Sequence, residues 1–289
     1  MTKAKGSLLA AMTIFGTVGI FVRYIPLPGA TVAFFRGVLG LLFMVIAMTL
    51  TGKKPDFSAI RKHFWILLLS GGAMGLNWVF LFESYRHTTV AVATVCYYLA
   101  PVFLVLVSPL LGERLTGKKL LLSGIALMGM VFVSGVLNGG ISGGKGIAFA
   151  VGAAALYTGV MFLNKKLGAI SAYDKTVMQL AAAAVVILPY CLFTGGFSME
   201  QLTGGEYALL AVVGIVHTGI AYWLYFGALG QLPSQSVALF SYLDPVIAIV
   251  LSALWLGEMM HWQEVLGAAL ILGSALWSEL PGKKVIKKG

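Results

Sequence analysis

Charged residues are scarce in this chain of 289 residues, at 10% of the total, whereas hydrophobic residues make up 59%. A soluble domain carries about 25% charged residues, so the side chains available here do not cover a water-facing surface. The mean hydropathy of +0.94 is typical of a protein whose outer surface faces lipid. The composition therefore excludes a soluble globular protein, and we expect an integral membrane protein whose partner is the lipid bilayer.

Reactive and metal-binding side chains are also few. The two cysteines, Cys96 and Cys191, fall inside apolar runs and are typical of small buried hydrophobes. The four histidines are scattered, and neither HExxH nor GxSxG occurs. Gly139–Gly146 (GGISGGKG) matches the opening of a phosphate loop, but Gly146 stands where magnesium needs Ser or Thr. We therefore expect no catalytic residues, no metal site and no cofactor, and interpret residues 139–145 as a Gly-rich linker.

Ten apolar runs of about 20 residues dominate the chain, and that length spans a bilayer core of about 30 Å. Only helices or closed barrels satisfy backbone groups in lipid, and alternating barrel strands are absent, so the sequence predicts an all-α membrane protein with ten transmembrane helices. The expected spans are near 6–25, 30–51, 65–85, 90–112, 119–136, 145–163, 173–194, 206–226, 233–256 and 262–280.

Basic residues are concentrated on one of the two sides of the membrane that ten spans would create. With the N-terminus inside, only Arg23, Arg86 and Lys145 lie in external segments. An excess of Lys and Arg marks cytoplasmic loops, so we expect both termini in the cytoplasm of a plasma (inner) membrane protein, and attribute the net charge of +10 to topology rather than to nucleic acid. The basic residues of the expected cytoplasmic segments are Lys3, Lys5, Lys53, Lys54, Arg61, Lys62, Arg114, Lys118, Lys119, Lys165, Lys166, Lys283, Lys284, Lys287 and Lys288.

The two halves of the chain resemble each other. Tyr98–Pro101 (YLAP) begins a run that ends in Gly112-Glu113, and Tyr242–Pro245 (YLDP) begins a run that ends in Gly257-Glu258. Five helices in each half is an odd number, so the second repeat enters the membrane from the opposite side. We predict a 5+5 inverted-topology repeat, with residues 1–138 and 146–289 as the two units, and a substrate site between them.

These residues, with Phe34-Phe35-Arg36 in the second span, resemble the EamA-type branch of the drug/metabolite transporter superfamily. One departure is that the first Pro-to-Gly spacing is one residue shorter than the second and contains an extra Pro109. The resemblance covers nearly the whole chain and implies export of amino acids or other small metabolites without ATP.

Ionisable residues inside spans cost about 2.5–3.5 kcal/mol on insertion scales and are functional by default. Asp244 is the main candidate for binding a proton or a cationic substrate, because its counterpart in the first half is Ala100. The alternatives are that it caps backbone freed by Pro245 or sits neutral in a hydrogen-bond network. Arg36 either binds a substrate carboxylate or pairs with Glu83, and the pair is slightly favoured. Glu83, a second coupling candidate, could instead bond Arg86.

Other polar and aromatic residues complete the expected site. His217 is a candidate proton relay, because its unperturbed pKa is about 6.5, although a bond to a neighbouring helix is favoured; Asn77 has the same alternatives. Pro101 and Pro245 each remove a helix hydrogen bond and are expected hinges. Among the aromatics we expect Tyr97, Tyr98 and Tyr242, beside the prolines, to contact substrate, and we keep Trp78 as a further candidate.

The favoured function is a secondary transporter, a monomer or homodimer, that exports a small molecule by alternating access with possible proton coupling. A membrane-embedded lipid-modifying enzyme would need a polar catalytic cluster at one membrane face, and the sequence contains none. A facilitative channel or uniporter stays open, although it gives no reason for the difference between Ala100 and Asp244.

Overall fold

The computed structural model describes residues 2–112, 116–133, 143–167, 170–193, 202–229, 231, 240–241 and 243–279. Within these residues the chain forms helices joined by short connections, with no strand, so the expected all-α class is confirmed there. The helices are α1 (Thr2–Arg23), α2 (Gly29–Leu50), α3 (Phe57–Lys62), α4 (Phe64–His87), α5 (Val90–Tyr97), α6 (Ala100–Val107), η1 (Ser108–Leu111), α7 (Gly117–Val133), α8 (Gly144–Lys165), α9 (Ala172–Phe193), α10 (Gly204–Gly214), η3 (Ile215–Ile220), α11 (Ala221–Leu229), α13 (Leu243–Leu256) and α14 (Trp262–Glu279).

Seven helical segments in the described part of the chain are long and apolar enough to cross a membrane. Two of them are composite, because α5 with α6 forms one segment and α10, η3 and α11 form another. The helices coincide with the expected apolar runs within a few residues, except that residues 233–239 and 242 of the expected span 233–256 lie outside the described residues. Two differences matter. The expected span 90–112 is divided in its middle, and α8 begins at Gly144, inside the segment interpreted as a linker.

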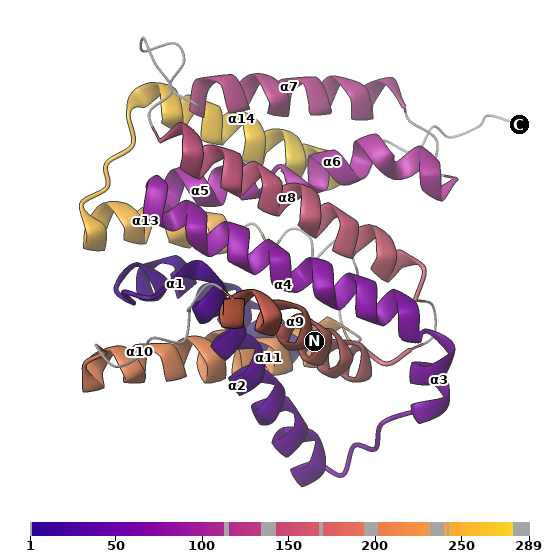
Figure 1. Cartoon of the computed structure of the whole chain (residues 1–289). Coiled ribbons are helices and arrows are strands. Elements are labelled where there is room, and N and C mark those ends of the chain that lie inside the picture. The colour runs from indigo at the N-terminus through magenta and orange to yellow at the C-terminus, as the bar shows by residue number, and fades with distance from the viewer. Residues whose placement is uncertain are drawn as a thin grey trace, which may run out of the picture.

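Glycines allow the helices to approach closely. A Cβ atom at Gly16 would lie 2.7 Å from the carbonyl oxygen of Asp244, so α1 contacts the backbone at the start of α13. A Cβ atom at Gly267 would lie 2.5 Å from the carbonyl oxygen of Gly129, which brings α14 against α7. Figure 1 shows α7 and α14 side by side at one edge of the bundle, with α10 and α11 at the other. The contact of α1 with α13 positions the site described below.

Helix α2 runs from one end of the helix bundle to the other. Its 22 residues correspond to about 33 Å at 1.5 Å per residue, close to the thickness of a bilayer core. The arginine end, where α2 begins, is defined by Arg23, Arg86 and Glu258. The lysine end, where α2 finishes, is defined by Lys53 and Tyr173.

Candidate functional site at a helix break

The segment from Val90 to Val107 is interrupted at its midpoint. Helix α5 ends at Tyr97, α6 begins at Ala100, and Tyr98 and Leu99 form a turn between them. The amide of Tyr98 bonds the carbonyls of Thr94 and Val95, both at 3.1 Å. Pro101 has no amide hydrogen, so it cannot bond the carbonyl of residue 97, and the helix is broken where that bond is missing. The break lies about nine residues from either end of the apolar segment.

The start of α13 provides the matching feature in the second half of the chain. Asp244 and Pro245 are the second and third residues of this helix, and Pro245 is buried. Proline is accommodated in the first turn, because amides there have no acceptor within the helix. Both prolines therefore lie in the first turn of a helix as the structure bounds it, Pro101 in α6 and Pro245 in α13.

A hydrogen bond joins these two features. The hydroxyl of Tyr98 donates to Oδ2 of Asp244 at 3.0 Å and lies 3.1 Å from the carbonyl oxygen of Ser241. The carboxylate of Asp244 is in the first turn of α13, where the helix dipole favours a negative charge. The break in the first half and the helix start in the second half thus meet at one polar contact, although the two residues are 146 positions apart.

Aromatic rings surround this contact on the side of α5. The ring of Tyr97 stacks on Tyr157 at a centroid distance of 5.4 Å and meets Tyr98 edge-on at 6.2 Å. The hydroxyl of Tyr97 donates to Oδ1 of Asn77 at 3.4 Å, and Nδ2 of Asn77 donates to the carbonyl of Ala153 at 2.6 Å. Both polar atoms of the Asn77 side chain therefore bond neighbouring helices, which favours a structural role for this residue over substrate binding.

Arg36 forms a second group with residues of α4 and η3. Its Nε donates to the hydroxyl of Thr218 at 2.7 Å, and its guanidinium lies over the rings of Trp78 and Phe82, 4.5 and 5.4 Å from their centroids. Cation–π contacts and hydrogen bonding hold Arg36 although only 5% of the residue is exposed.

The expected pairing of Arg36 with Glu83 is not formed among the described residues. Oε1 of Glu83 lies 3.2 Å from Nε2 of His87, one turn further along α4. The alternative partner, Arg86, donates to the carbonyl of Leu27 at 2.7 Å. Arg36 stacks on Trp78 instead, and sequence depth alone does not reveal that contact. Glu83 is thus placed near the arginine end, apart from the helix break.

His217 is held on both ring nitrogens. Nε2 lies 2.8 Å from the hydroxyl of Thr17 on α1, and Nδ1 lies 3.3 Å from the carbonyl of Val212. The hydroxyl of Thr17 donates to the carbonyl of Ile14 at 2.7 Å, so it accepts from Nε2–H of His217, a tautomer inferred from the partners. This geometry favours cross-helix bonding over a proton relay. The residue belongs to a π-helix, an insertion that is frequent at functional sites.

The structure therefore brings together some of the expected site residues and separates others. Tyr97, Tyr98, Asn77 and Asp244 lie around the helix break, and Tyr242 is outside the described residues. Sequence reasoning missed the roles of Thr17 and Thr218, because a hydroxyl in an apolar helix gives no periodic pattern.

The described part of the chain contains long apolar helices, and one of them is broken at its midpoint, where it meets a helix start from the other half of the chain. This combination is typical of multi-pass membrane transporters. The family comparison agrees: the model of the EamA-like transporter family matches residues 4–135 and again residues 144–279. The chain belongs to the EamA-like transporter family.

Individual relatives support the same family. The chain is 31% identical over 278 residues to the uncharacterized transporter YxxF of Bacillus subtilis (strain 168), which covers 93% of this chain and 87% of that protein. It is 27% identical over 199 residues to a probable terminal-alkyne amino-acid exporter of Streptantibioticus cattleyicolor, over 68% of this chain and 64% of that one. A solved crystal structure shares the fold, with a TM-score of 0.65, 21% identity and 96% of each chain covered.

Proposed function

We propose that the protein is a secondary transporter of the plasma membrane that exports a small metabolite by alternating access. In this proposal the chain crosses the membrane ten times as two inverted five-helix units, with both termini in the cytoplasm. Two successive matches to one family model support the repeat. The bias of Lys and Arg toward alternate connections supports the orientation. The arginine end is then external and the lysine end cytoplasmic.

The observation that carries the proposal is the contact of Tyr98 with Asp244. Discontinuous helices that meet near the membrane midplane, at the interface of two repeats, form the substrate sites of many secondary transporters. Here a break near the middle of one apolar segment faces the first turn of α13, and the contact contains an ionisable group. Such a group inside a membrane is costly and is retained at ion and substrate pathways.

The chemistry of this contact favours a solute with an amino group. The carboxylate of Asp244 and the hydroxyl of Tyr98 are acceptors for an ammonium, and the rings of Tyr97 and Tyr157 offer faces that attract a cation. The amino-acid exporter among the relatives has a substrate class that carries such a group. We further propose that Asp244 binds either a proton or the solute, which couples export to the proton gradient.

Solute counterflow in proteoliposomes tests this proposal. The panel comprises neutral and aromatic amino acids, amines and nucleobases, each with and without a pH gradient. We expect at least one amino compound to exchange, and we expect Asp244→Asn to abolish the dependence on the pH gradient while leaving the protein folded. Glu206→Gln is the matched control, because Glu206 caps α10 through Thr203 and glutamine retains that capping geometry.

The outcomes separate the alternatives. Exchange that keeps its pH dependence in Asp244→Asn removes this residue from the coupling. Uncoupled flux that does not saturate with solute concentration favours a channel over a transporter. A folded wild-type protein that exchanges no member of the panel contradicts the proposed transport function.

A further inference from the structure

Glu258 occupies an unusual position for a residue in a connection between helices. It follows Gly257, whose φ of +67° reverses the chain after α13. Its side chain folds back toward the bundle and is only 11% exposed. Oε2 accepts from the hydroxyl of Ser252 at 2.5 Å and from the amide of Val90 at 2.8 Å, and Oε1 lies 3.4 Å from Nη2 of Arg23. A carboxylate in a connecting segment is thus fully engaged by protein groups.

The bond to Val90 caps a helix that belongs to the other half of the chain. The first amides of an α-helix have no acceptor within it, and the side chain of Thr89 accepts only from the amide of Val92. Glu258 supplies an acceptor for Val90 from 168 positions away in sequence. A negative charge at this place also interacts favourably with the dipole of α5. The start of α5, the half-helix that ends at the Tyr98 break, is therefore fastened to the end of α13.

Arg23 extends the same contact to two further segments. It is the last residue of α1, and its Nη1 donates to the carbonyls of Tyr85, in α4, and Thr88. Through Nη2 it binds Glu258. One carboxylate and one guanidinium thus join the ends of α1, α4 and α13 to the start of α5. Three of these elements lie in the first half of the chain and one lies in the second.

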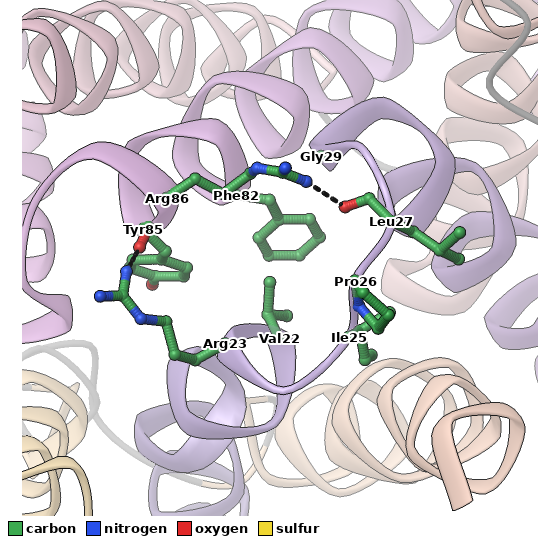
Figure 2. A pocket seen from close by; sticks show the side chains of 9 residues that line it. All are labelled: Val22, Arg23, Ile25, Pro26, Leu27, Gly29, Phe82, Tyr85 and Arg86. Atoms are coloured by element: carbon green, nitrogen blue, oxygen red, sulfur yellow. Dashed lines mark hydrogen bonds between the residues drawn. The ribbon is translucent and has the colours of Figure 1, made fainter. Parts of the chain in front are cut away.

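A cavity of about 240 Å³ lies beside this contact. Figure 2 shows Arg23 on one side of the cavity and Arg86 across from it, with Val22 and Phe82 between them. This polar space is large enough to hold water around a released guanidinium. Separation of Arg23 from Glu258 would therefore leave the cation beside a cavity that can hold water.

We propose that Arg23, Val90, Ser252 and Glu258 form a gate, the Glu258 gate, that holds the arginine end closed and releases when the two halves separate there. The proposal rests on the transport function proposed above and concerns the regulation of access to the same site. The gate acts on both helices that meet at the centre, because α5 ends at Tyr97, next to Tyr98, and α13 contains Asp244 in its first turn. Opening at the arginine end thus moves the two elements that form the substrate contact.

The test measures a distance and needs no transported solute. Spin labels at Tyr24→Cys and Met259→Cys report the separation across the arginine end, since these residues are 49% and 76% exposed. The buried Cys96 and Cys191 are replaced by alanine. Double electron–electron resonance in proteoliposomes should give mainly the short distance in the wild-type background. We expect Glu258→Ala to shift most of the population to a longer distance, and Glu258→Gln to shift less, because glutamine still accepts from Val90.

Two further variants make the result specific. Glu264→Gln is the matched control, because Glu264 lies in the first turn of α14 and accepts from the nearby amide of His261, so its replacement should leave the distances unchanged. Arg23→Gln added to Glu258→Ala should produce little further shift if the two residues act as one gate. Distances in Glu258→Ala and Glu258→Gln that match those of Glu264→Gln overturn the gate. A failed counterflow assay with an intact distance shift overturns the transport proposal alone.

Discussion

The two ends of the bundle are held by different kinds of interaction. At the arginine end a carboxylate with 11% exposure binds a guanidinium, a hydroxyl and a helix amide. At the lysine end the exposed Lys53 places its ammonium 3.3 Å from the ring centroid of Tyr173 and 4.8 Å from that of Trp223. Both contacts join one half of the chain to the other, but only the first uses opposite charges and main-chain capping.

This difference indicates which end separates more easily. A cation–π contact at an exposed site contributes about 0.5–1 kcal/mol, and an ammonium that leaves the rings regains its hydration at once. The second contact at the lysine end is also weak, since the amide of Asp56 lies 3.4 Å from Oδ2 of Asp174. Judged by these polar contacts, the arginine end is therefore the more firmly joined of the two in this structure.

The largest expected effect concerns which side of the membrane each end faces. Tyr24→Cys at the arginine end should react with a membrane-impermeant maleimide in intact cells, whereas Phe57→Cys at the lysine end should react only after permeabilisation. Both residues are well exposed, at 49% and 75%, and the buried native cysteines should give little background. The reverse pattern would exchange the sides and make the firmly joined end cytoplasmic.

Removing the carboxylate at the arginine end should lower the free energy of unfolding more than removing the ammonium at the lysine end. Glu258→Ala deletes the acceptor of the Val90 amide and the Ser252 hydroxyl, and at about 1 kcal/mol for each hydrogen bond we expect a loss of about 2 kcal/mol. The free energy of unfolding, measured by titration with sodium dodecyl sulfate in mixed micelles, reports this loss. Met259→Ala, at an exposed neighbour, should change it by less than about 0.5 kcal/mol.

Removing the ammonium at the lysine end should have the smallest effect. Lys53→Met keeps the apolar stem but loses the cation over Tyr173 and Trp223, so the same measurement should fall by about 0.5–1 kcal/mol. Lys54→Met removes the same charge from the adjacent residue and serves as the control, with little change expected. A loss for Lys53→Met that equals or exceeds the loss for Glu258→Ala would reverse the ranking of the two ends.

Much of the helical layout follows from local properties and was predictable. Apolar runs of about 20 residues located the helices within a few residues, because the length of a span is fixed by the bilayer. Because Pro101 has no amide hydrogen, an interruption of helix hydrogen bonding was predicted in the fourth apolar run. What the pattern did not reveal was its form, a turn at Tyr98–Leu99 with separate helices on either side.

The contacts of the site were less predictable, because they depend on how helices rotate and approach. Asp244 and Tyr98 were identified from the sequence as candidate site residues. Their hydrogen bond was not predicted, because it depends on how α1 and α5 pack on α13. Arg36 was matched with Glu83 by depth alone, and the rings of Trp78 and Phe82 were the real neighbours. The repeated Gly-Glu pair was noticed as a mark of the repeat, while the capping role of Glu258 required the folded position of Val90.

The break at Tyr98–Leu99 has a consequence for how this protein evolves. Any non-proline residue at position 101 would restore an amide hydrogen and favour one continuous helix from Val90 to Val107, so the simplest route to a more stable protein runs through the loss of this break. Stabilising changes of this kind tend to reduce activity where function depends on strained or interrupted structure. If transport depends on the break, as proposed above, selection for stability and selection for transport act in opposite directions at this one position.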